Sequence, residues 1–74
     1  MKIENFIKDF CDQFDGAVNL TPMTNFRDLE DWSSLTALNV LMMIDESYGV
    51  ALNPDDMRKT KTVQELFDLV QSKL

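Results

Sequence analysis

Residues 31–50 read DWSSLTALNVLMMIDESYGV, and this stretch decides the fold. Its start is polar and irregular, but from Leu35 onward apolar side chains return every three or four residues. That spacing predicts an amphipathic helix from about Ser34 to Tyr48, which Gly49 is expected to stop. Ser34 therefore stands at a helix N-terminus. Unpaired backbone N–H groups and the positive end of the helix dipole favour a capping oxygen or an attached phosphate there.

The apolar surface of this expected helix is broad. A helix that is apolar on more than one face usually contacts something further. Two interpretations stay open: neighbouring helices surround it within a small bundle, or part of its surface meets a partner protein. The residues predicted to form its core-facing row are Leu35, Leu38, Leu41 and Met42, with Ile44 and Tyr48 as further candidates and with Val40 and Met43 flanking the row.

A second helical stripe lies nearer the N-terminus and predicts a helix over residues 2–14. Gly16 is expected to follow its end in the left-handed conformation. Cys11 falls on the apolar side of this helix, so a buried structural thiol is expected. A long connection over residues 17–32 comes next, and Phe26 and Leu29 are expected to pin it across the bundle. The stripe consists of Ile3, Phe6, Ile7, Phe10, Cys11 and Phe14.

Two helices are predicted in the C-terminal third. Asn53 followed by Pro54 is typical of a helix start, and this helix is short, ending near residues 58–60. Thr62 and Glu65 match a capping box that opens a last helix running to about Lys73. The sequence therefore predicts an all-α bundle of four helices, with a long first loop and a short third helix, in one domain over residues 1–74.

This pattern resembles acyl carrier proteins and related phosphopantetheine-binding carriers, whose signature is Asp-Ser-Leu at the start of the second of four helices. The resemblance covers essentially the whole chain, including the acids and tyrosine at 45–48, the segment 52–56 and Thr62-Val63. It implies that Ser34 is the attachment point of 4′-phosphopantetheine, whose thiol holds an acyl group as a thioester. Ser34 is preferred to Ser33 because this register leaves Leu35 and Leu38 at the family's apolar positions.

The chain departs from the signature at Ser33, which stands where the family has the aspartate that helps engage the phosphopantetheinyl transferase. The family's second helix also binds partners through acids, but Thr36 and Asn39 occupy two positions that are often acidic. Recognition is therefore expected to be less electrostatic than in the family. The partner-binding residues that the resemblance implies are Leu35, Leu38, Met42, Asp45 and Glu46.

Two further expectations concern Trp32 and the bundle interior. Trp32 beside the serine resembles the Trp-Asp-Ser-Leu form of stand-alone carriers in specialised clusters. Packing of the loop against the bundle is an equally good interpretation of this side chain. Between visits to enzymes, the acyl chain is expected to be shielded among Phe26, Leu41, Ile44, Val63 and Phe67.

Composition narrows the class of function. Thirteen acidic and seven basic residues leave a formal net charge of −6, which disfavours nucleic acid as a partner and favours basic surfaces. The alternative is that the acidic composition keeps the protein soluble and serves no basic partner. No segment approaches the roughly 18 apolar residues of a membrane span, and the start lacks the pattern of an export signal. A monomer in the cytoplasm is expected.

The absence of histidine excludes Ser-His-Asp and Cys-His catalytic arrangements and imidazole metal sites, and no metal site is expected. We therefore expect a carrier and not an enzyme. Its implied partners are a phosphopantetheinyl transferase and acyl- or aminoacyl-activating and transferring enzymes, in fatty-acid or specialised metabolite biosynthesis. An unmodified carrier-like module that binds other proteins through the same helix remains the alternative.

Overall fold

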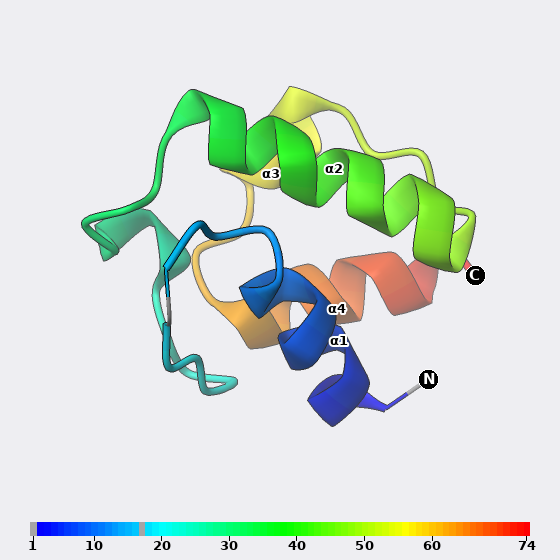
Figure 1. Ribbon diagram of the computed structural model, residues 1–74. Coiled ribbons are helices and arrows are strands. Elements are labelled where there is room, and N and C mark those ends of the chain that lie inside the picture. The colour runs from blue at the N-terminus through cyan, green and yellow to red at the C-terminus, as the bar shows by residue number, and fades with distance from the viewer. Residues whose placement is uncertain (1, 17) are drawn as a thin grey trace.

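The computed structural model describes residues 2–16 and 18–74, and the regular elements within them are all helical (Figure 1). This confirms the expected all-α class. The expected start of the long connection at Ala17 lies outside the described residues. In chain order the elements are α1 (Ile3–Cys11), the 3₁₀ turn η1 (Phe26–Asp28), α2 (Ser34–Tyr48), α3 (Pro54–Arg58) and α4 (Val63–Ser72).

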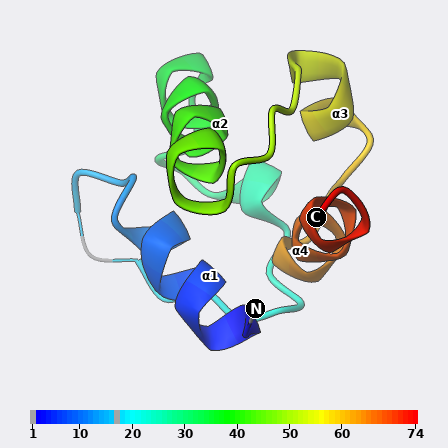
Figure 2. The same ribbon diagram turned by 90° about the vertical axis from the view of Figure 1, so that its right-hand side faces the viewer.

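The core lies where α1, α2 and α4 face one another, as the view nearly along α2 shows (Figure 2). Aromatic rings fill much of it: the ring centroids of Phe6 and Phe67 are 5.5 Å apart, and those of Phe10 and Phe26 are 5.6 Å apart. Offset and edge-on contacts of this kind add to the free energy gained from burying the rings. The largest fully buried side chains are Phe6, Phe10, Phe26, Ile44, Leu66, Val40, Val63 and Val70.

Local capping sets the helix ends. The Asn53 side chain accepts from the Asp56 N–H and completes a capping box at the start of α3, and Thr62 and Glu65 do the same for α4. Both predicted helix starts are confirmed. Gly49 closes α2 with a φ of 69°, the left-handed conformation that glycine adopts without steric cost.

The connection between α1 and α2 is tied to the beginning of α4. Phe26 is fully buried and Leu29 packs against the core, so the two predicted anchors are confirmed. A short antiparallel bridge pairs Asn25 with Thr62. Around it, the Phe26 N–H donates to the Lys61 carbonyl at 3.2 Å and the Val63 N–H donates to the Thr24 carbonyl at 3.1 Å. This pairing, which the sequence did not reveal, anchors the segment that leads into α2.

The end of α1 differs from expectation. The helix stops at Cys11 instead of Phe14, although Phe14 is still buried and continues the apolar stripe beyond the helix. Gly16 has no positive φ, so it is not the predicted left-handed cap. Cys11 is half-buried, and its thiol donates to the Val18 carbonyl. Burial raises the pKa of this thiol, which keeps it protonated and fits a structural role.

The predicted core-facing row of α2 is wrong for Leu35, Leu38 and Met42, whereas its further candidate Ile44 is confirmed as fully buried. Leu35, Leu38 and Met42 are 67%, 53% and 52% exposed, and Leu41 is only partly buried. Both rows of apolar residues repeat with the helical period, so periodicity alone does not decide which of them meets α1 and α4. The residues that α2 buries are Thr36, the candidate Ile44 and the two flanking residues Val40 and Met43.

Candidate functional site

The candidate site contains two neighbouring serines, Ser33 and Ser34, which have different roles. Ser33 is the N-cap of α2: its hydroxyl oxygen accepts from the Thr36 N–H at 3.2 Å. The Ser33 and Thr36 hydroxyls also share a hydrogen bond of 3.1 Å, and the Thr36 hydroxyl donates to the Asp31 carbonyl at 3.3 Å. These contacts hold the loop and the first turn of α2 together without using Ser34.

Ser34 occupies the first helical position and is exposed. Its hydroxyl makes no hydrogen bond within residues 2–16 and 18–74, so the cap role that the sequence also allowed for Ser34 belongs to Ser33. Within the same residues, the N–H groups of Ser34 and Leu35 likewise have no acceptor. The first turn therefore presents free donors beside a free hydroxyl, an arrangement that suits a negatively charged group.

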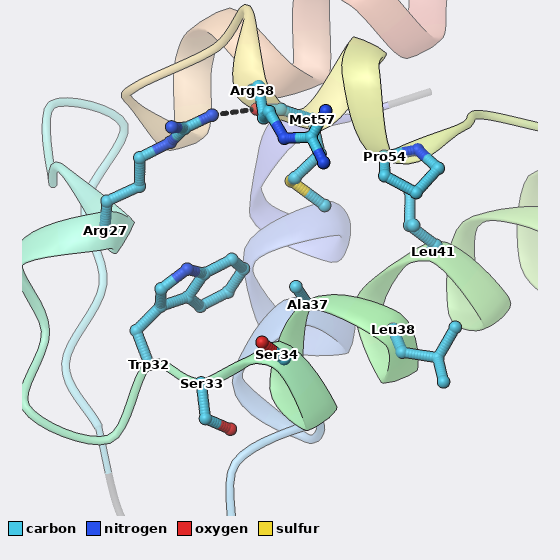
Figure 3. Close-up of a pocket in the computed structure, with 10 residues that line it drawn as sticks. All are labelled: Arg27, Trp32, Ser33, Ser34, Ala37, Leu38, Leu41, Pro54, Met57 and Arg58. Atoms are coloured by element: carbon cyan, nitrogen blue, oxygen red, sulfur yellow. Dashed lines mark hydrogen bonds between the residues drawn. The ribbon is translucent and has the colours of Figure 1, made fainter.

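Beside Ser34 the surface is hollowed into a cavity of about 460 Å³ between α2 and α3 (Figure 3). In Figure 3 the Ser34 hydroxyl points toward the side of the cavity that Trp32 forms, whereas the Ser33 hydroxyl points away. Trp32 forms one wall and also packs on the core, since its ring centroid lies 4.9 Å from that of Phe26. The lining residues are Arg27, Trp32, Ser33, Ser34, Ala37, Leu38, Leu41, Pro54, Met57 and Arg58.

This cavity is not the interior pocket that we expected. Of the five residues named for that pocket, only Leu41 lines the cavity. Phe26, Ile44 and Val63 are fully buried and Phe67 is nearly so, and all four belong to the same packed core. The space beside Ser34 lies instead between α2 and the five-residue helix α3.

The residues expected to bind partners share one face of α2. Leu35, Leu38 and Met42 are spaced by three and four positions, and all three are exposed. Asp45 and Glu46 continue this face to the end of the helix and are exposed as well. The exposure of Leu35, Leu38 and Met42 is also what contradicts their predicted place in the core-facing row.

Arg27 and Arg58 were not singled out from the sequence. They are 31 positions apart and come from different elements, η1 and α3, so no spacing signals that they share a cavity wall. Within the described residues, no group of three or more carboxylates or thiols is placed to hold a metal ion. None of the helices of that part of the chain has the length and apolarity needed to cross a membrane.

Comparisons with known proteins agree with this geometry. The family model described as a phosphopantetheine attachment site matches residues 5–70. A curated acyl carrier protein from Thermosynechococcus vestitus is 27% identical over 55 residues, which cover 74% of this chain and 68% of that protein. A solved structure of holo acyl carrier protein from Geobacter metallireducens superposes with a TM-score of 0.79 and 28% identity, covering 96% of this chain and 83% of that one.

Proposed function

This chain belongs to the phosphopantetheine-attachment family of carrier proteins, and from that membership we propose that it is an acyl carrier protein bearing 4′-phosphopantetheine on Ser34. The observation that carries the proposal is the free, exposed Ser34 hydroxyl at the head of α2, beside the cavity. Ser33 is already committed to the helix cap, so the two serines are not equivalent.

The residues around Ser34 fit the group. The open N–H groups of Ser34 and Leu35, at the positive end of the α2 dipole, would hold a phosphate ester on this hydroxyl. The apolar cavity wall offers cover to part of an extended arm. When attached, the arm supplies a terminal thiol that carries acyl groups as thioesters. The chain itself positions and shields, and we propose no catalytic residue.

Carrier domains of this family interact with partner enzymes. For this chain we propose a phosphopantetheinyl transferase and enzymes that activate or transfer acyl or aminoacyl groups, with docking on α2. Leu35, Leu38 and Met42 supply the apolar centre of that surface, and Asp45 and Glu46 supply charge at its end. We propose that it works as a cytoplasmic monomer, in fatty-acid or specialised metabolite biosynthesis.

The test is intact mass after coexpression with a broad-specificity phosphopantetheinyl transferase. Wild type and Ser33→Ala are expected to gain the mass of one phosphopantetheinyl group, and Ser34→Ala is expected to gain none. Circular dichroism of Ser34→Ala must show a folded protein. Modification of Ser34→Ala would place the arm elsewhere, and an unmodified wild type would contradict the proposal.

One observation favours a second function. Ser33 stands where the family has an aspartate that engages the transferase, and this change suits a module that keeps the docking helix without the arm. An unmodified wild type, together with retained binding of a partner protein through Leu35 and Leu38, would support that alternative.

A further inference from the structure

The two arginines of this acidic chain, Arg27 and Arg58, both line the cavity beside Ser34. No lysine contributes to its lining. A chain with a net charge of −6 has thus placed both of its guanidinium groups at the one cavity that the proposed arm enters. Figure 3 shows the two side chains on the side of the cavity opposite α2.

Each guanidinium has a hydrogen-bond partner and further N–H donors to spare. The Arg27 Nη2 donates to the Met57 carbonyl at 2.5 Å, near the C-terminus of α3. Arg58 pairs with Asp55 on the surface of α3, where the two side chains are 69% and 75% exposed. A guanidinium has five N–H donors, and these are the only hydrogen bonds of either group within the described residues.

Apart from Ser33 and Ser34, the rest of the cavity wall is apolar and is formed by Trp32, Ala37, Leu38 and Leu41, together with Pro54 and Met57 of α3. A ligand that fits this arrangement has an apolar middle and a negative end. Guanidinium groups bind carboxylates with paired, charge-assisted hydrogen bonds. The wall and the arginines together therefore describe an acyl chain with an acidic terminus.

Resting on the proposed function, we infer that the cavity selects acyl groups whose far end is a carboxylate, with Arg27 and Arg58 as the counter-ions. The arm's own phosphate is a second source of negative charge. That phosphate would be fixed to Ser34, beside the open N–H groups of the first turn of α2, whereas both arginines lie on the opposite side of the cavity (Figure 3). We therefore assign the arginines to the distal end of the cargo.

The test uses free probes on the unmodified protein, so that it does not depend on Ser34. S-glutaryl-pantetheine and S-pentanoyl-pantetheine, which differ by a terminal carboxylate, are titrated while the Trp32 indole and arginine Nε–H signals are followed by NMR. We expect the glutaryl probe to bind about tenfold more tightly, and the advantage to shrink as salt is raised.

Variants then locate the effect. Arg58→Met is expected to reduce the advantage of the glutaryl probe to about twofold or less, because it removes one of the two counter-ions. The variant is expected to fold, because the side chain is exposed and its ion pair adds little stability. Arg27→Met is expected to act in the same direction, and Lys73→Met, the same charge loss at the end of α4, is expected to have no effect. Asp55→Asn releases Arg58 from its present partner and should tighten glutaryl binding alone, which a purely structural role would not produce.

The outcomes separate this inference from the proposed function. Equal binding of the two probes overturns the inference even if Ser34 is modified. Arginine shifts of the same size with 4′-phosphopantetheine, which has no acyl group, assign the guanidinium groups to the phosphate and also overturn it. A wild type that never gains the arm, yet prefers the glutaryl probe, contradicts the proposed function and leaves the anion site standing.

Discussion

At the scale of single residues, Ser33 and Ser34 have different roles because Ser33 precedes the first helical position of α2 and Ser34 occupies it. Ser33 has extended backbone and turns its oxygen to the Thr36 N–H, whereas Ser34 is already helical and has no such geometry available. The sequence predicted a serine at a helix start and preferred Ser34 for the arm. It did not reveal that Ser33 makes the cap.

The first residue-scale prediction concerns stability. Ser33→Ala should lower the free energy of unfolding by about 1 kcal/mol, because the Thr36 N–H loses its acceptor. Ser34→Ala should change it by less than about 0.5 kcal/mol. Urea denaturation followed by circular dichroism measures both values. Equal losses in the two variants would contradict the assigned cap.

A second residue-scale prediction concerns pH. The Tyr48 hydroxyl donates to Asp9 Oδ2 at 2.8 Å and joins α2 to α1. Two effects raise the pKa of Tyr48 to about 12: burial is the larger, and this hydrogen bond to Asp9 is the second. The ordinary tyrosine pKa is 10.0, so the neutral phenol stabilises the fold fully below that pH, and the contribution is lost as pH rises toward 12.

The measurement for Tyr48 is an alkaline titration of tyrosinate absorbance alongside denaturation at several pH values. Stability should fall across that interval in wild type and fall less in Tyr48→Phe, which keeps the ring contact with Phe6. A midpoint at the ordinary tyrosine pKa would show that the contact between α1 and α2 does not protect the phenol.

At the scale of elements, the caps at Asn53, Thr62 and Gly49 were predicted correctly because they depend on neighbouring residues, whereas the cap predicted at Gly16 was wrong. Asn53 and Thr62 begin α3 and α4 as predicted, and Gly49 ends α2. The end of α1 was not predicted, because the apolar stripe runs on through Phe14 after the helix has stopped. Periodicity marks which residues are buried, and burial continues into the loop.

The glycines provide an element-scale prediction with a matched control. A Cβ at Gly49 or at Gly16 meets nothing within 4 Å, but only Gly49 has a positive φ. Gly49→Ala should therefore cost about 1 kcal/mol through backbone strain alone, and Gly16→Ala should be neutral or slightly stabilising. Thermal unfolding of the two variants decides the matter, and similar losses in both would argue against the left-handed cap.

At the scale of the whole molecule, α2 has two apolar rows, of which one is buried in the core and the other is exposed to solvent. Val40 and Ile44 face α1 and α4, while Leu35, Leu38 and Met42 lie outside. The inner row stabilises the fold. The outer row is the face proposed to meet partners, so its substitutions should affect docking and not folding.

Two leucines test this separation. Leu66→Ala empties a fully buried position and should cost about 2–5 kcal/mol, a large share of the stability of so small a domain. Leu35→Ala changes a side chain that is 67% exposed and should cost less than about 0.5 kcal/mol. Chemical denaturation gives both numbers, and the KM of the transferase for each folded variant should rise only for Leu35→Ala.

The sequence by itself determined the helical class, the starts of α3 and α4 and the glycine stop after α2, whereas Ser34 was proposed for attachment from the family resemblance over the whole chain. The features that the sequence determined depend on residues within about four positions of one another, where hydrogen bonding is local. Only the tertiary structure decided which row of α2 is buried, how the connection pairs with α4, and that Arg27 and Arg58 share a cavity with Ser34. Those outcomes depend on which distant side chains already fill the core, and no local pattern in the chain carries that information.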